Sequence, residues 1–278
     1  MTRAANELRV AQPALSKTIR QLETELGYLL FDRVGKNIHL NENGRILLKH
    51  ANTILGELED LRIEIQEANK HRENEVVVSM QAASQLLPRI ISGFRSAHPN
   101  IKISITHESG EKAGRWDVAI QGSRHSVQTA NNRTVLKEHI LLALPREHRL
   151  AGKSVVKLSE VAGESFIGLQ KGMALREITD EYCIMAGFTP TVALESDNPS
   201  TIRDLLELGI GVCLIPEITW KVKSNERIRL VKVVSPACRR YLNVVTQERS
   251  YTPGAVEHFK NFLVDFFKHL QDSHTTEE

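Results

Sequence analysis

Apolar residues recur at helical spacing between Ala11 and Gly27, the most informative stretch of the chain. They follow one another at steps of four, three and four positions: Leu15, Ile19, Leu22 and Leu26. This spacing places them on one face of an amphipathic helix. Pro13 suits the first turn of that helix, where a missing N–H is no loss, and Gly27 suits its end.

The opposite face of the predicted helix carries hydrogen-bond donors: Gln12, Ser16, Lys17, Arg20 and Gln21. No acidic residue accompanies them before Glu23. A reader of DNA phosphates and base edges requires such donors. Most polar helix faces are simply solvated, however, so the neighbouring segments have to decide between the two interpretations.

The segments on either side favour DNA binding. Residues 2–8 predict a short helix, joined by a brief turn to the next one, which makes a helix-turn-helix. Residues 29–40 predict two short strands with Arg33 and Lys36 near the connecting turn. A basic hairpin in this place is a wing that can reach phosphates or the minor groove. Residues 1–49 also hold eight basic against five acidic side chains.

A heptad pattern follows the hairpin. Asn41 to Gly44 open a long helix whose apolar positions alternate steps of four and three: Leu47, Ala51, Ile54, Leu58, Leu61, Ile65 and Ala68. Such a seam is typical of a coiled coil. The alternative is a long helix lying on the core of its own domain. The polar character of the other positions between Glu57 and Arg72 favours a dimerising linker helix over residues 42–73.

From Glu75 onward, predicted strands and helices alternate as in a doubly wound α/β domain. Strands are expected at 76–78, 101–105, 117–120, 166–169 and 210–215, and helices at 86–94, 175–185, 200–208 and 256–270. Four further segments belong to the same domain: 136–144, 192–194, 228–234 and 241–246.

Composition narrows the class of protein. The 278 residues, 25% charged and with a net charge of +2, have room for about two or three hydrophobic cores. The N-terminus lacks the apolar core of a signal peptide and no apolar run is long enough to span a membrane, so we expect a cytoplasmic protein without membrane contact.

Catalytic chemistry finds little support in the sequence. Cys183, Cys213 and Cys238 have no C-x-x-C spacing, and the first two lie in apolar surroundings typical of core cysteines. The histidines are scattered, so we expect no metal site. Glycine-rich phosphate loops and serine-nucleophile turns are lacking, so we expect no enzyme and no cofactor.

The order and spacing of the N-terminal motifs resemble those of LysR-type transcriptional regulators. The resemblance is carried by Thr2-Arg3-Ala4-Ala5, Gln12-Pro13-Ala14-Leu15-Ser16-Lys17, Ile19-Arg20-Gln21-Leu22-Glu23, Leu26-Gly27 and Leu30-Phe31-Asp32-Arg33. It continues more loosely through Asp117-Val118-Ala119-Ile120, Ala186-Gly187-Phe188-Thr189-Pro190 and Gly209-Ile210-Gly211-Val212. It therefore spans nearly the whole chain.

The resemblance implies an arrangement of three parts. A winged helix-turn-helix would occupy 1–41, the dimerising linker helix 42–73, and a periplasmic-binding-protein-like effector domain 74–272. The effector domain would have two α/β subdomains, about 75–122 plus 242–270 and about 123–241, with crossovers near Gly122 and Tyr241. The implied partners are double-stranded DNA with a partly palindromic operator, a small-molecule effector, and a second copy in a homodimer or dimer of dimers. RNA polymerase is a further candidate partner.

The resemblance also assigns DNA contacts. Gln12 and Pro13 would touch base edges, with Lys17 as a further reader. Ser16, Arg33 and Lys36 would hold phosphates, and Arg20 lies on the same polar face.

Ligands of open α/β sheets bind beyond the carboxyl ends of the strands, often at helix N-termini. The loops in question supply Gln81, Ala82, Ser84, Gln170, Lys171, Asp197, Ser200 and Thr201. Backbone N–H groups near Ser84, the two hydroxyls of the last loop and the charge of Lys171 would hold a small anionic metabolite. The alternative is that these residues are ordinary helix caps.

Two departures from the family pattern affect these expectations. Members of the family begin with an additional apolar helix before the position of Thr2, and we expect the natural start to lie upstream. Without that helix Leu8, Leu15, Ile19 and Leu22 would lose part of their cover. The alternative function is then a ligand-binding, dimerising protein with impaired DNA binding. The second departure is a short loop at 109–115 where the family has a helix, so the first subdomain should be one helix smaller.

Overall fold

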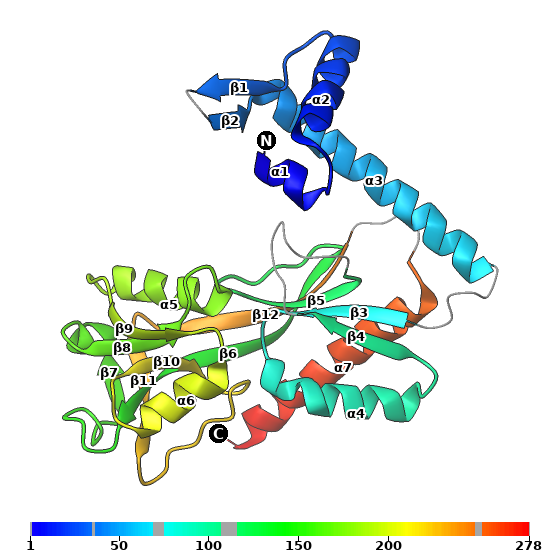
Figure 1. Cartoon of the computed structure of the whole chain (residues 1–278). Helices are drawn as coiled ribbons and strands as arrows, with labels where there is room; N and C mark the ends of the chain where they lie inside the picture. Colours follow the sequence, from blue (N-terminus) through cyan, green and yellow to red (C-terminus); the bar gives the residue numbers. More distant parts are fainter. Residues whose placement is uncertain (1, 35–36, 69–74, 107–115, 248–251, 278) are drawn as a thin grey trace. The chain divides into compact units, whose positions relative to one another are not determined.

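A computed structural model describes residues 2–34, 37–68, 75–106, 116–247 and 252–277 (Figure 1). The chain divides into two compact units. The N-terminal unit is mainly Met1–His71, and the C-terminal unit comprises Arg72–Glu248 with Thr252–Glu278.

The N-terminal unit contains the predicted helix-turn-helix, hairpin and long helix. Its elements are α1 (Thr2–Glu7), α2 (Gln12–Leu26), β1 (Phe31–Val34), β2 (Asn37–Leu40) and α3 (Glu42–Ala68). Strands β1 and β2 pair antiparallel, with Phe31 opposite Leu40. The predicted turn at Gly35 and Lys36 lies outside the described residues.

Side chains in this unit fix where the helices begin and end. Helix α2 ends at Gly27, whose φ of 77° is the left-handed conformation that glycine adopts without strain. The Asn41 side chain accepts a hydrogen bond from the Gly44 N–H and so caps α3. Glu23 of α2 accepts a hydrogen bond of 2.8 Å from the Leu30 N–H, which ties α2 to the segment just before the hairpin.

The C-terminal unit is built on a mixed sheet of eight strands in the order β4-β3-β5-β12-β6-β11-β7, with β10 also pairing with β6. Its strands are β3 (Glu75–Met80), β4 (Lys102–Thr106), β5 (Val118–Ser123), β6 (Asn132–Pro145), β7 (Val155–Lys157), β10 (Cys213–Pro216), β11 (Ile228–Ser235) and β12 (Arg239–Thr246). A separate pair is formed by β8 (Ser165–Leu169) and β9 (Thr191–Ser196). The helices are η1 (Ser84–Leu86), α4 (Leu87–Ala97), η3 (Leu158–Val161), α5 (Ala174–Met185), α6 (Pro199–Glu207) and α7 (Gly254–Glu277).

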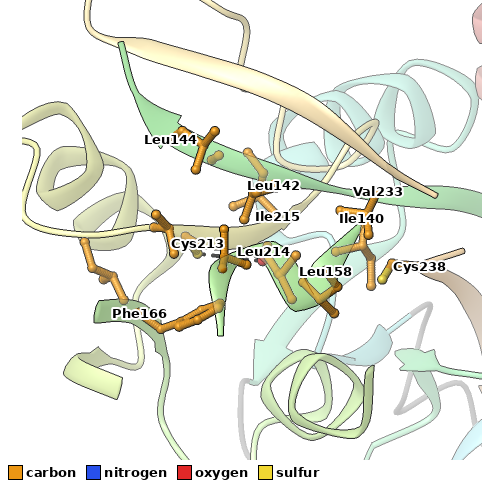
Figure 2. Close-up of a cluster of buried hydrophobic side chains, with 14 of the residues drawn as sticks. Ile140, Leu142, Leu144, Leu158, Phe166, Cys213, Leu214, Ile215, Val233 and Cys238 are labelled. Atoms are coloured by element: carbon orange, nitrogen blue, oxygen red, sulfur yellow. Dashed lines mark hydrogen bonds between the residues drawn. The ribbon is translucent and has the colours of Figure 1, made fainter. Parts of the chain in front are cut away.

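Two hydrophobic cores divide this unit into lobes. In the first lobe, α4 and α7 pack against the β3–β5 part of the sheet, and Phe94 meets Phe259 edge to face at 4.9 Å between ring centroids. In the second lobe, β6, β10 and β11 pack with η3, α5 and α6. Figure 2 shows part of this second core, with Ile140, Leu142 and Leu144 of β6 lying beside β10.

Strand β6 runs from one core to the other. Its first residues pair with β12 and place Leu136 in the first core, whereas Ile140 lies in the second. The segment 218–220 also connects the two cores, since Ile218 packs in the first core and Trp220 in the second. The expected second subdomain, 123–241, therefore contributes to both cores.

The predicted strand at 210–215 begins later than expected. Gly209 takes a φ of 71° at the end of α6, and Val212 bonds to Ser165 and Ile167 of β8 instead of to β6. Regular pairing with β6 starts only at Cys213. The expected loop at 109–115 lies outside the described residues.

Gly44 generates the first testable prediction. A Cβ at this position would clash with the Leu30 carbonyl oxygen, so Gly44→Ala forces the start of α3 away from the hairpin. We expect this variant to lower the free energy of unfolding of the N-terminal unit by roughly 1–3 kcal/mol, the cost typical of overpacking, and so to lower its melting temperature. Circular dichroism and differential scanning calorimetry of the full chain measure it.

Gly56 is the matched control on the same helix. A Cβ there meets nothing within 4 Å, so Gly56→Ala should stabilise α3 by up to about 1 kcal/mol through helix propensity alone. Equal melting temperatures for the two variants would contradict the described packing at Gly44.

Candidate functional site

The polar face of α2 is available to an external partner. Gln12, Lys17 and Arg20 are exposed, and within the described residues neither Lys17 nor Arg20 has an acidic partner. The Gln12 amide donates a hydrogen bond of 2.9 Å to the Ser16 hydroxyl one turn along the helix. Pro13 is also exposed, in the first turn. The predicted DNA contacts on α2 therefore share one accessible face.

The apolar face of α2 is only partly covered. Leu15 and Ile19 are half-buried, while Leu22 and Leu26 are 37% and 43% exposed. Leu8 is 61% exposed.

The hairpin places Arg33 on β1, opposite Ile38 on β2. Lys36, the other predicted phosphate contact of the wing, lies outside the described residues.

The heptad seam of α3 is a row of apolar side chains that the described chain leaves open. Ile54 is 67% exposed, and Leu58, Leu61 and Ile65 are 44%, 52% and 52% exposed. Leu47 and Ala51, nearer the hairpin, are half-buried. An apolar row of this length on the surface of a helix is typical of a protein–protein contact.

A cavity of about 820 Å³ lies in the C-terminal unit, at the ends of β3, β8 and β9. This volume is in the range of small-molecule sites. Of the residues predicted for the effector, five line it: Gln81, Ala82, Ser84, Gln170 and Asp197.

Three of the predicted effector residues do not line this cavity: Lys171, Ser200 and Thr201. Ser200 is engaged by contacts within α6. The Asn198 side chain accepts a hydrogen bond of 2.8 Å from the Ser200 N–H, so it caps the helix. The Ser200 hydroxyl accepts from Arg203. Lys171 is exposed in the turn before α5. Ser200 therefore lies in the first turn of α6, where its N–H is the group that Asn198 caps, and its contact with an anion stays a prediction.

The wall of the cavity formed by α5 is held by Arg176, which is 5% exposed. Its guanidinium donates to the Leu169 carbonyl at 2.8 Å and to the carboxylates of Glu195 and Asp180 at 2.6 and 2.9 Å. Desolvation opposes its charge, but the two carboxylates outweigh that effect and the pKa of Arg176 is raised. This arrangement fixes the loop that carries Gln170.

A buried ion pair lies at the back of the cavity. Arg240 of β12 is 2% exposed and donates from Nε to Glu138 of β6 at 2.8 Å, while its Nη2 donates to the Thr219 hydroxyl. Glu138 also accepts hydrogen bonds from the N–H groups of Ile218 and Thr219 and from the Thr219 hydroxyl. Arg240 lines the cavity itself.

Sequence reasoning did not identify Glu138 or Arg240 as members of the site. The sequence does contain an indication of the buried pair, because alternation along β6 puts Glu138 on the same face as the apolar Leu136 and Ile140. A charged residue in an apolar row of a strand needs a buried partner. The partner, 102 positions away in the chain, is not indicated by any local spacing.

The three cysteines are buried. Burial raises the pKa of the thiols of Cys183, Cys213 and Cys238 to about 12. The thiols are therefore protonated at neutral pH, in agreement with the predicted core role of Cys183 and Cys213. Among the described residues, no group of three or more His, Cys, Asp and Glu side chains could hold a metal ion.

None of the helices in the described residues combines the length and the apolar character needed to cross a lipid bilayer.

Comparison with known protein families covers both units. The family described as "Bacterial regulatory helix-turn-helix protein, lysR family" matches residues 1–45, and the "LysR substrate binding domain" matches residues 68–268. Because the first match includes α1, α2 and the hairpin, the alternative of a ligand-binding protein with impaired DNA binding gains no support.

Individual relatives agree with this result. The chain is 29% identical to the uncharacterized HTH-type transcriptional regulator YybE of Bacillus subtilis, over 96% of this chain and 94% of the relative. It is also 29% identical to the transcriptional dual regulator GltC of Bacillus subtilis, over 93% of this chain and 89% of the relative.

A solved structure agrees in fold. The crystal structure of HinK, a LysR family transcriptional regulator from Pseudomonas aeruginosa, has a TM-score of 0.58 and 22% identity, over 96% of this chain and 92% of that one. The winged helix-turn-helix and the two-lobed α/β domain thus occur together in a solved regulator. The chain belongs to the LysR family of DNA-binding transcriptional regulators, with a substrate-binding domain behind the helix-turn-helix.

Proposed function

We propose that this regulator acts in the cytoplasm as a dimer or dimer of dimers and reads a partly palindromic operator with α2 in the major groove. The observation that carries the proposal is the exposed donor face of α2, where Lys17 and Arg20 have no acidic partner within the described residues. The protein works by binding and not by catalysis, with RNA polymerase as a candidate partner on the promoter.

The proposal divides the DNA contacts by role. Gln12, Pro13 and Lys17 read base edges, while Ser16, Arg20 and the two wing residues Arg33 and Lys36 hold phosphates. Phosphate contacts fix the position of a protein on DNA, and base contacts select the sequence.

A small molecule with an anionic group binds in the cavity and changes how the dimer sits on DNA. The cavity is supported as the effector site by its volume of about 820 Å³ and by its place at the ends of β3, β8 and β9. The seam of α3 supports dimerisation, because burying each of its exposed side chains against a second copy contributes roughly 1.5–3 kcal/mol.

Replacement of Gln12 tests the assignment of base contacts. We expect Gln12→Ala to reduce discrimination at one operator base pair by about 1–3 kcal/mol, with little change in the dependence on salt. Arg33→Ala should instead weaken binding to every sequence and lower the slope of log K against log salt by about 0.9. Fluorescence anisotropy with the upstream region of the protein's own gene and single-base variants measures both effects. The same loss of specificity in both variants would refute this division of roles.

Replacement of Ile54 tests the seam. We expect Ile54→Glu to raise the dimer dissociation constant by about tenfold or more, since the loss of one buried apolar side chain exceeds about 1.4 kcal/mol. Thr53→Glu is the control, because this exposed neighbour lies outside the heptad seam. Sedimentation equilibrium of the full chain measures both constants. A dimer equally stable in both variants would mean that α3 does not form the interface.

A further inference from the structure

Arg240 presents one unused hydrogen-bonding group to the cavity. Its Nε and Nη2 are bonded to Glu138 and Thr219, whereas its Nη1 has no partner among the described residues. A Cβ placed at Gly122 would lie 3.8 Å from this Nη1 and 4.0 Å from the Cβ of Ala82, which lines the cavity. Since the residue is 2% exposed and lines the cavity, Nη1 is a fixed donor at its floor.

The charge of Arg240 is only partly neutralised by its partner. The Glu138 carboxylate accepts three further hydrogen bonds, two from backbone N–H groups and one from the Thr219 hydroxyl. These donors compete with the guanidinium for the carboxylate's negative charge. The side of Arg240 that faces the cavity therefore stays electropositive, and a carboxylate is its best match, because a planar guanidinium fits carboxylate geometry.

The lining also includes acidic side chains. Glu177 of α5 and Asp197 after β9 both line the cavity and are exposed, and neither has a cationic partner in the part of the chain that the structure describes. Lys171, the expected source of positive charge, does not line it. The cavity thus joins one buried cation to two solvated carboxylates.

This polarity restricts the ligand. A dicarboxylate that placed one group on Arg240 would leave its other group in a cavity whose remaining charged side chains, Glu177 and Asp197, are acidic, and like charges lower affinity. A simple amine would leave the donor of Arg240 unused. A ligand with one carboxylate and one ammonium group satisfies both ends. Apolar lining from Leu169 and Met173 is available to a side chain.

Resting on the proposed effector function, we propose that the effector is an α-amino acid or a similarly zwitterionic metabolite. Its carboxylate binds Nη1 of Arg240, and its ammonium group binds the carboxylates of Glu177 and Asp197. Arg240 thereby selects the acid and the two carboxylates select the amine.

Isothermal titration calorimetry of the full-length protein tests this proposal. The probes are the twenty common L-α-amino acids and, for the tightest, the matching 2-oxo acid, decarboxylated amine and amino-acid amide. A panel of dicarboxylates completes the set. We expect one amino acid to bind at least about tenfold more tightly than its 2-oxo acid or its amine, the factor lost with one charged hydrogen bond.

Two exposed substitutions give the decisive comparison, because they leave the buried network intact. In the double variant Glu177→Gln, Asp197→Asn, the preference for the amino acid over its 2-oxo acid should fall by about tenfold. Asp204→Asn is the control, an exposed acid on α6 that does not line the cavity, and it should leave the preference unchanged. Arg240→Lys should lower affinity for the amino acid but not for its amide.

The outcomes distinguish failure of the zwitterion assignment from failure of the proposed effector function. Tighter binding of a 2-oxo acid or dicarboxylate in this cavity would overturn the zwitterion assignment and leave an effector function standing. An unchanged preference in the double variant would also overturn it. Failure of every probe to bind would count against both.

Discussion

The ion pair between Glu138 and Arg240 is the interaction on which the C-terminal unit depends. It lies where three segments meet that each place residues in both cores: β6, the stretch from Ile218 to Trp220, and the stretch from Cys238 to Leu242 of β12. Removing one partner of a buried pair typically costs about 3–5 kcal/mol, a large share of the roughly 5–15 kcal/mol that stabilises an average domain. Arg240 also lines the cavity. Stability and the proposed ligand recognition would therefore use the same side chain.

The crossing strands explain why a ligand in the cavity can influence more than its own contacts. Leu136 and Ile140 lie on the same strand, yet they belong to different cores. A change in the angle between lobes must be absorbed by β6, β12 and the segment before Trp220, because these connect the cores. Arg240 lies on one of these connections and hydrogen-bonds to the other two, so a ligand that bound Arg240, as proposed, would act on the segments that join the lobes.

The N-terminal unit could be predicted from sequence almost completely, because local rules determine it. Helix α2 follows from the spacing of Leu15 and Ile19 and from Gly27, and the start of α3 follows from the Asn41 cap. The lining of the cavity could be predicted only in part. Loop residues such as Gln81 could be predicted because they come directly after a predicted strand. Arg240 could not, because its position depends on Glu138, 102 residues away, and that pairing is a property of the tertiary fold.

The exposed seam of α3 would make operator binding depend on the concentration of the protein, if the seam forms the proposed dimer. A helix that covers its apolar row only with a second copy binds that copy according to mass action. At low concentration the protein would be monomeric and the seam exposed to water, so the two copies of α2 that would bind one operator would not be linked. At high concentration they are joined, and binding one half-site raises the effective concentration at the other. If α3 forms the proposed dimer through residues such as Ile54, the response of the regulator to its effector would depend on its own abundance as well.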